Sequence, residues 1–294
     1  MRKSLFVLVL LVTVALASSS VAAHTIGFAI STLDNPFFVD LKDGAEAKAA
    51  ELGISLRVVD AQDDPARQLS GIEDLIARQV DLILVNPTDS TAVVPAILAA
   101  NRAGIPVITV DRSADSGDVV AYIASDNILG GNMAGEFIAD LLNGQGKVVE
   151  LEGIPGTNAA RERGLGFSQA IAGYPGIEVV ARQEAGFDRA KGLNVMENIL
   201  QAQAEIDAVF AHNDEMALGA LIAIQSAGRA DKIEVVGFDA TDDAVKAVKE
   251  GRMLATVAQQ PRLIGAFGVE TALRVLQGET VDDFIPVPLE LVTD

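Results

Sequence analysis

The chain contains no cysteine and no tryptophan, and its histidines are only two, His24 and His212. These absences exclude disulfide crosslinks, a cysteine–histidine catalytic pair and zinc sites with ordinary ligand spacing. No Walker loop and no G-x-S-x-G nucleophile elbow occurs in the sequence either. The residues therefore predict a protein that is not an enzyme, with no catalytic residue, no bound metal and no cofactor.

Positive charge is also scarce, since 22 Lys and Arg stand against 41 Asp and Glu, for a formal net charge of −19. Nucleic acids attract proteins through clustered Lys and Arg, so no nucleic-acid partner is expected. The excess of acid keeps a protein soluble, and it also disfavours anionic ligands.

Residues 1–23 have the pattern of a secretory signal peptide. Arg2 and Lys3 precede an uncharged apolar run over residues 5–17, and small residues precede His24. The run is shorter than the roughly 20 residues of a membrane-spanning helix. No cysteine follows it that could accept a lipid. We expect cleavage near Ala23 and a periplasmic, unanchored protein.

After that segment, apolar β-rich runs alternate with stretches of helical periodicity, as in βαβ units around parallel sheets. Several strands, such as 82–85 and 107–110, are apolar on both faces, which indicates helices on both sides of the sheet. The fold class is therefore α/β, and about 270 residues suffice for two domains. Strands are predicted at 25–31, 55–60, 81–86, 106–110, 121–124, 147–152, 178–182, 207–211, 233–238 and 254–258.

A weak internal repeat suggests how these strands divide. Residues 129–136 and 263–270 share Leu, Gly and Glu at the same offsets, and each segment follows a strand that ends in polar residues. Two equivalent halves, with the chain crossing between them at these points, would explain the repeat. No long linker rich in Gly, Ser or Pro separates the halves, so the two lobes should be closely joined.

Ligands of parallel sheets bind beyond the carboxyl ends of the strands, and polar side chains are frequent there in this sequence. Asn and Asp also favour turns and helix N-caps, which is the alternative interpretation of each one. The loop over 153–158 resembles a phosphate cradle but lacks its Lys and its spacing, and is interpreted as a plain loop. The polar residues at strand ends are Asn35, Asn86, Asp111, Arg112, Asn213, Asp214 and Asp239.

Asn35 and Pro36 indicate the start of a helix, because Asn is a good N-cap and Pro is favoured at the first helical position. Phe37 and Phe38 then fall in the first turn, next to the strand ends. One ring could pack inward while the other faces a cleft. Core packing is the alternative for at least one of them.

Five segments carry a resemblance to a known family: 31–38, 110–112, 159–164, 213–220 and 236–239. Together they are similar to the ribose-binding members of the type I periplasmic binding proteins, the D-ribose receptors of ABC importers. The resemblance implies two Rossmann-like lobes joined by a three-strand hinge, with crossings near Ser125, Gln259 and residue 288. It implies residues 24–125 and 260–288 in the N-terminal lobe, and 126–259 and 289–294 in the C-terminal lobe.

The same resemblance implies a ligand shell from both lobes, and two neighbouring positions depart from the pattern: Asp34 stands in place of Asn, and Ala240 in place of Gly. Two acids and two arginines make this shell formally neutral, which favours an uncharged polyol. Its members are Asn35, Phe37, Phe38, Asp111, Arg112, Arg163, Phe187, Asn213, Asp239 and Gln259.

The expected function is the capture of a small neutral sugar, D-ribose first, by hinged closure of the lobes. The resemblance implies the membrane permease of an ABC importer as the partner of a monomeric receptor, with a chemotaxis receptor as a second candidate. Allose, arabinose or a related polyol is the alternative ligand. A sugar-responsive regulator core would need a DNA-binding helix-turn-helix where the signal peptide stands. A sugar-processing enzyme would use Asp111 or Asp239 as acid and base.

Overall fold

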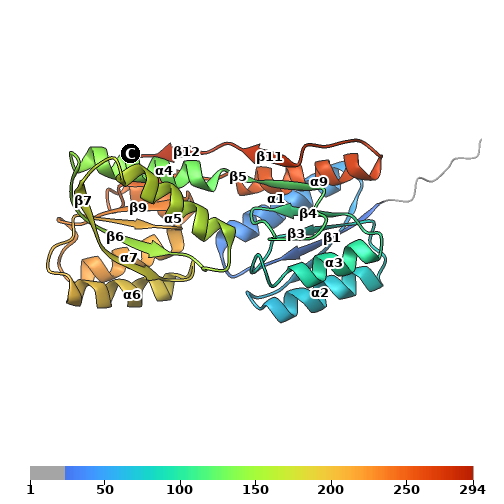
Figure 1. The fold of residues 1–294 in the computed structure, drawn as a ribbon, viewed down its shortest axis with the longest axis horizontal. Coiled ribbons are helices and arrows are strands. Elements are labelled where there is room, and N and C mark those ends of the chain that lie inside the picture. The colour runs from blue at the N-terminus through green and yellow to red at the C-terminus, as the bar shows by residue number, and fades with distance from the viewer. Residues whose placement is uncertain (1–23, 294) are drawn as a thin grey trace, which may run out of the picture.

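The computed structural model describes residues 24–293, and the predicted signal peptide lies outside this range. Two α/β units stand end to end along the long axis of the molecule (Figure 1). Each contains one six-stranded sheet with helices on both faces. The predicted fold class is confirmed. Within residues 24–293, no helix has the length and apolar character needed to cross a membrane.

The first sheet has the strand order β11-β5-β4-β3-β1-β2, and all its neighbouring strands are parallel. With its covering helices it is called the first lobe below. Its strands are β1 (Thr25–Ile30), β2 (Ser55–Asp60), β3 (Leu82–Val85), β4 (Val107–Val110), β5 (Ala121–Ser125) and β11 (Phe284–Val287). Its helices are α1 (Pro36–Leu52), α2 (Pro65–Ala77), α3 (Val94–Arg102) and α9 (Pro261–Leu276).

The second sheet has the order β12-β10-β9-β8-β6-β7, which matches the first sheet strand for strand. It differs in that its last strand, β12, runs antiparallel to β10. With its helices it is called the second lobe. Its strands are β6 (Gln145–Glu152), β7 (Gly176–Glu184), β8 (Ala208–Ala211), β9 (Glu234–Asp239), β10 (Ala255–Ala258) and β12 (Glu290–Val292). Its helices are α4 (Asn127–Leu141), α5 (Asn158–Ile171), α6 (Arg189–Ala202), α7 (Asp214–Ser226) and α8 (Asp242–Lys249).

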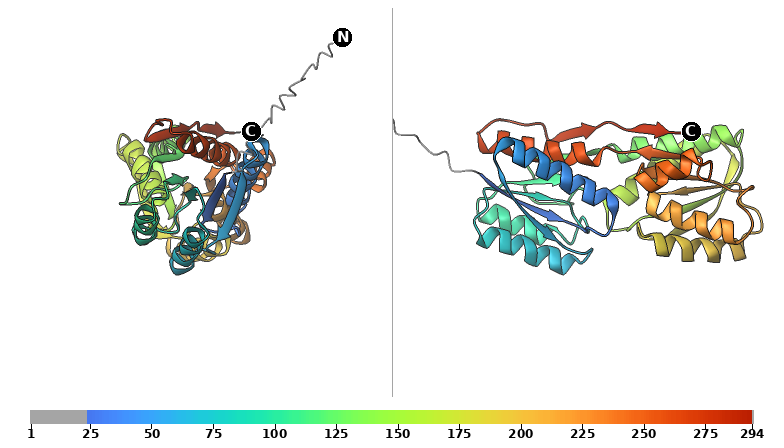
Figure 2. Two further views of the ribbon diagram at one scale, coloured as in Figure 1. Left: turned by 90° about the vertical axis from the view of Figure 1, so that its right-hand side faces the viewer. Right: turned by 180° about the vertical axis from the view of Figure 1, so that it is seen from behind.

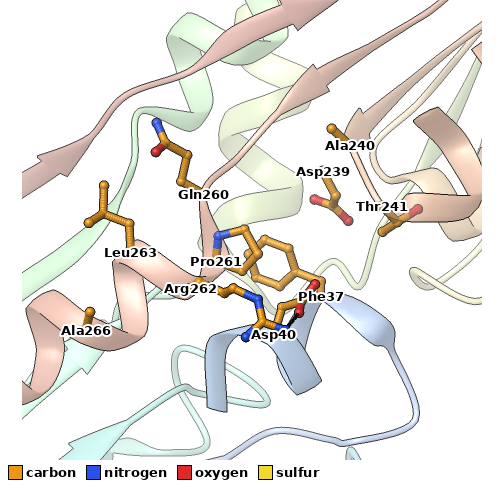
Figure 3. A pocket seen from close by; sticks show the side chains of 10 residues that line it. All are labelled: Phe37, Asp40, Asp239, Ala240, Thr241, Gln260, Pro261, Arg262, Leu263 and Ala266. Carbon is orange, nitrogen blue, oxygen red and sulfur yellow. Dashed lines mark hydrogen bonds and ion pairs between the residues drawn. The ribbon is translucent and has the colours of Figure 1, made fainter. Parts of the chain in front are cut away.

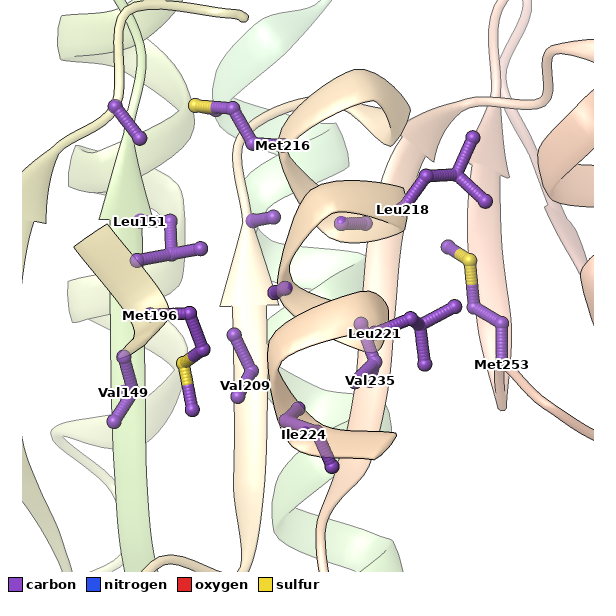
Figure 4. Close-up of a cluster of buried hydrophobic side chains, with 14 of the residues drawn as sticks. Val149, Leu151, Met196, Val209, Met216, Leu218, Leu221, Ile224, Val235 and Met253 are labelled. Atoms are coloured by element: carbon purple, nitrogen blue, oxygen red, sulfur yellow. The ribbon is translucent and has the colours of Figure 1, made fainter. Parts of the chain in front are cut away.

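Separate apolar layers hold each sheet to its helices. In the second lobe, Val149, Val209 and Val235 of neighbouring strands pack against the side chains of α6 and α7, as Figure 4 shows. Met196 and Met216 fill the space between these helices and the sheet. Because these apolar side chains are buried between sheet and helices, the strands have fixed positions, and the loops at their ends are fixed as well.

All ten predicted strands are present, with ends shifted by at most two residues. The sequence did not predict β11 and β12. Both strands are short and half exposed, so they lack the continuous apolar run of the central strands. β11 also contains Pro286, a residue that is rare within strands but tolerated at a sheet edge such as this one.

The chain passes between the sheets three times, from β5 to α4, from β10 to α9 and from β11 to β12. The last crossing lies in the terminal segment that runs along both lobes (Figure 2). These passages lie where the family resemblance expects hinge crossings, near Ser125, Gln259 and residue 288. The limits of the lobes as separate moving units stay a prediction.

The internal repeat corresponds to two equivalent helix contacts. Its two segments lie in α4 and α9, the first helix after a crossing in each direction. A Cβ atom on Gly131 of α4 would lie 2.1 Å from the carbonyl oxygen of Arg163 in α5. A Cβ atom on Gly265 of α9 would lie 2.0 Å from the carbonyl oxygen of Leu41 in α1. The shared glycines therefore allow two helix backbones to touch.

Gly131→Ala should force α4 and α5 apart, because the added methyl group meets backbone rather than a flexible side chain. We expect a loss of about 1–3 kcal/mol in the free energy of unfolding, the usual cost of overpacking. Denaturant titration measures it. Gly173→Ala is the control, since its nearest atom would be 3.5 Å away. Equal stability of the two variants would contradict the close helix contact.

Candidate functional site

A small cavity lies between the carboxyl ends of the strands of the two lobes, with about 250 Å³ of space between its atoms. Only about 20 Å³ of it admits the centre of a water-sized molecule, so the side chains around it stand close together. All ten residues predicted from the sequence line it, together with Ala159. The structure thus brings the whole set together, and their role in binding stays a prediction.

Asn35 begins α1 and carries the two phenylalanines to the cavity. Its side-chain oxygen accepts a hydrogen bond of 3.0 Å from the backbone N–H of Phe37, with Pro36 at the first helical position. The rings of Phe37 and Phe38 meet edge to face, with centroids 5.2 Å apart. Both rings line the cavity and also pack in the core of the first lobe. The two alternatives considered for these rings are therefore compatible.

Asp111 and Arg112 follow β4 in a turn that is hydrogen-bonded to the loop after β3. Asp111 has a positive φ of 63°, and its carboxylate accepts a hydrogen bond of 3.1 Å from the side chain of Asn86. Arg112 donates to the carbonyl of Pro87 at 3.1 Å. Its guanidinium lies 5.0 Å from the ring centroid of Phe38. Burial raises the pKa of Asp111, and the nearby guanidinium of Arg112 opposes that shift.

Arg163 of α5 reaches the cavity from the second lobe. Its Nε donates to the side-chain oxygen of Asn127 at 2.9 Å, and its Nη1 donates to the carbonyl of His212 at 2.6 Å. Nη1 also lies 3.5 Å from the carboxylate of Asp239. The guanidinium stacks 3.8 Å from the centroid of Phe238. A side chain with this many contacts is pre-organised to present one edge to a ligand.

Asp239 ends β9 opposite Arg163. Gln259, next to the second crossing, donates to its carboxylate at 2.8 Å. Burial raises the pKa of Asp239 well above its ordinary value. Arg163 opposes this shift and the buried carboxyl of Asp214 adds to it. Asp239 and Ala240 both have positive φ, 121° and 58°, which explains why glycine would suit position 240.

Phe187 and Asn213 complete the wall of the second lobe. The ring of Phe187 lies so close to Gly153 that a Cβ atom there would be 2.1 Å from it. Asn213 is the N-cap of α7 and accepts a hydrogen bond of 3.0 Å from the N–H of Met216. Asn35 and Asn213 are thus helix caps, as the alternative interpretation held, and they line the cavity as well.

Several supporting residues could not be found from the sequence. Asn127 holds Arg163 but follows β5 of the other sheet, and His212 acts through its backbone carbonyl, which every residue possesses. Asp214 was noted as a strand-end residue, but nothing in the sequence indicates that its side chain is fully buried. Only three-dimensional contacts assign these roles.

A second, wider hollow opens beside the cavity, next to the start of α9 (Figure 3). It shares Phe37 and Asp239 with the cavity, and it is also lined by Asp40 and Arg262, which form an ion pair. Its remaining lining is mostly apolar or backbone. We place the candidate site in the smaller cavity, because buried charged and amide side chains of both lobes converge there. Within the same residues, no group of three or more His, Asp or Glu is arranged to hold a metal ion.

Asp214 holds the turn that carries Asp239. Its fully buried carboxylate accepts hydrogen bonds from the N–H of Thr241 at 2.8 Å and from the hydroxyl of Thr256 at 2.7 Å. The same hydroxyl accepts from the N–H of Ala240 at 3.2 Å. Burial raises the pKa of Asp214 to about 7, and these hydrogen bonds oppose the shift.

The stability of the Asp214→Asn variant, relative to wild type, should increase as pH rises. The carboxyl ionises near pH 3.8 when unperturbed and near pH 7 in the folded protein. The folded state therefore binds more protons in this window, and wild-type stability falls as pH rises through it. The asparagine cannot titrate. We expect the melting temperature of the variant, relative to wild type, to rise between pH 5 and pH 8. A difference that stays constant would contradict the raised pKa.

Known proteins resemble this chain over nearly its whole length. A family model described as the periplasmic binding protein domain matches residues 26–280. The ribose import binding protein RbsB of Haemophilus influenzae is 57% identical over 284 residues, covering 97% of this chain and 96% of that protein. An ABC transporter solute binding protein of Bacillus halodurans with bound myo-inositol has a TM-score of 0.88 at 39% identity, covering 92% and 94% of the two chains. One of Actinobacillus succinogenes with bound D-allose has a TM-score of 0.87 at 35% identity, covering 92% and 97%.

Proposed function

The chain belongs to the periplasmic binding protein family, and we propose that it captures D-ribose outside the cytoplasm and delivers it to the permease of an ABC importer. The observation that carries this proposal is the convergence of ten side chains from both lobes on one small cavity. The high identity to a ribose import binding protein supports ribose in particular.

The cavity chemistry supports a sugar. A pentose has hydroxyl groups around its edge, which both donate and accept hydrogen bonds, and weakly polar C–H groups on its faces. Phe37, Phe38 and Phe187 can cover the faces, while Asp111 and Asp239 accept from the hydroxyls. Hydrogen bonds to charged groups contribute about 1.5–3 kcal/mol each, more than neutral ones. A few of them suffice for tight binding.

The charge of the cavity supports a neutral ligand. Arg112 lies 3.7 Å from the carboxylate of Asp111, and Arg163 lies 3.5 Å from that of Asp239. Each positive charge therefore already has a negative neighbour. A carboxylate or phosphate ligand would meet two acids in a buried space, where repulsion is poorly screened.

We propose that binding closes the two lobes, over residues 24–125 with 260–288 and 126–259 with 289–294, about the three crossings. The sugar contacts residues of both lobes, so only the closed form makes all contacts, and ligand shifts the equilibrium towards it. The closed form would then be recognised by the permease, and a chemotaxis receptor is a second candidate partner. We also propose that the receptor acts as a monomer after cleavage near Ala23, and that it releases the sugar unchanged.

A different polyol is the second candidate ligand. Solved neighbours with bound D-allose and myo-inositol favour it, at 35% and 39% identity. Both ligands have six carbons and six oxygens, one of each more than ribose, and both are uncharged. The cavity chemistry described above suits all three.

D-ribose should bind with a stoichiometry of one and reduce the radius of gyration of the protein, because closure brings the lobes together. Calorimetry measures the first and small-angle scattering the second. D-allose, L-arabinose and myo-inositol serve as comparison ligands and should bind more weakly. Tighter binding of one of them would transfer the proposal to that sugar, and binding without compaction would refute closure.

Arg163→Ala should weaken ribose binding by about 2–5 kcal/mol, the cost of removing one partner of a buried hydrogen-bonded charge pair. Arg161→Ala is a matched control on the same helix. Arg161 pairs with Asp115 of the first lobe at 3.4 Å, but both side chains are about half exposed, so the loss of this inter-lobe pair should change affinity by no more than about 1 kcal/mol, equally for every sugar. Equal effects of the two variants would exclude Arg163 from the site.

A further inference from the structure

The two lobes also touch each other directly, through the loop over residues 153–158 and the start of α5. The N–H of Ser90 in the first lobe donates to the carbonyl of Gly156 at 2.9 Å. The N–H of Asn158 donates to the hydroxyl of Ser90 at 3.2 Å. This loop resembles a phosphate cradle in sequence, and in the structure its hydrogen-bond partners include polar groups of the opposite lobe.

The side chain of Asn158 uses both its oxygen and its nitrogen to bind groups of the first lobe. Its oxygen accepts a hydrogen bond from the N–H of Ser113 at 2.9 Å. Its nitrogen donates to the hydroxyl of Tyr122 at 3.0 Å and to the carboxylate of Glu162, in its own lobe, at 3.1 Å. Asn158 is only 3% exposed, so these bonds are shielded from water. We call Asn158 with Ser90, Ser113 and Tyr122 the inter-lobe bridge.

The bridge holds the turn that presents Asp111 and Arg112 to the cavity. Ser113 is the next residue of that turn, and the hydroxyl of Tyr122 donates to the carbonyl of Asp111 at 3.1 Å. Asp111 has a positive φ of 63°, a conformation that depends on such surrounding contacts. Asn158 itself does not line the cavity, although its neighbour Ala159 does.

These bonds join two lobes, so they exist only when the lobes are together. A contact present in the closed form and absent from the open form stabilises closure whatever ligand lies in the cavity. The apparent dissociation constant depends on how favourable that closure is. A bridge that does not touch the sugar therefore changes affinity for every sugar by the same factor.

We propose that Asn158 is an affinity-determining residue, which holds the closed lobes together through Ser113 and Tyr122 without contacting the ligand. The proposal rests on the sugar-binding function proposed above and adds a residue to it. It distinguishes Asn158 from the ten cavity residues, whose replacement alters the preference among sugars as well as the affinity.

Asn158→Ala removes two hydrogen bonds of the closed form and leaves buried partners unpaired. The dissociation constant for D-ribose should rise about 10- to 30-fold. Stopped-flow measurements should assign the change to faster dissociation, with the association rate nearly unchanged. The factor should be the same for whichever of D-allose and L-arabinose the wild-type protein binds. The melting temperature of the sugar-free protein should stay within about 1 °C, because the open form lacks the two inter-lobe bonds, and the bond lost to Glu162 within α5 is a weak i,i+4 contact.

Asn101→Ala is the matched control. The side chain of Asn101 also makes two hydrogen bonds to backbone, to the carbonyl of Asp118 at 3.0 Å and from its N–H at 2.9 Å, but both lie within the first lobe. This variant should lower the melting temperature and leave the dissociation constant unchanged. Tyr122→Phe combined with Asn158→Ala should be less than additive in affinity, because the two substitutions remove the same hydrogen bond between these side chains.

Each outcome separates the inference from the function on which it rests. Failure of the wild-type protein to bind any sugar would overturn the proposed function, and the inference with it. Wild-type binding with an unchanged dissociation constant for Asn158→Ala would overturn the inference alone. A factor that differs strongly between sugars would also overturn it, because Asn158 would then act on the ligand rather than on closure.

Discussion

Four charged side chains are buried together between the lobes. They neutralise one another in pairs, and the residues around them supply the hydrogen bonds that water would otherwise make. Asp111 lies beside Arg112, and Asp239 beside Arg163, all of them at most 5% exposed. Removing such groups from water costs several kcal/mol per ion unless partners replace the water. Asn86, Asn127, Gln259 and the carbonyls of Pro87 and His212 are those partners. Burial also raises the pKa of both acids.

The backbone conformation at the strand ends also positions the residues of the cavity. Asp111, Phe187 and Asp239 all have positive φ, which side chains larger than glycine seldom adopt. Conformations of this kind cost of order 1–3 kcal/mol each and persist where surrounding contacts compensate for them. Asp214 and the two threonines that it binds compensate at Asp239, and Tyr122 does so at Asp111. The packed sheets beneath supply the rigidity on which these turns depend.

The sequence predicted the alternation of strands and helices well, because the central strands are apolar along their whole length. It failed for β11 and β12, whose short and half-exposed segments carry no periodic signal. Ten of the eleven residues that line the cavity could be named in advance, since the family resemblance supplied them and strand ends such as Asp111 and Asp239 fitted it, whereas Ala159 was missed. Asn127, Asn158 and His212 could not, because each acts on a part of the chain remote in sequence.

The matching strand orders of the two sheets give Asp111 and Asp239 similar positions, Asp111 directly after the fourth strand of its lobe and Asp239 as the last residue of the fourth strand of the other. The cavity is therefore framed by an approximate twofold relation, with an acid at either side. An aldopentose has no such symmetry. On the proposed function, its orientation is set where the halves diverge, for example after the first strand, where one lobe offers Phe37 and Phe38 and the other Ala159 and Arg163, and after the second, where only Phe187 lines the cavity. In the proposed sugar site, the difference between the lobes rather than the paired acids is therefore the feature that can distinguish a sugar from its stereoisomers.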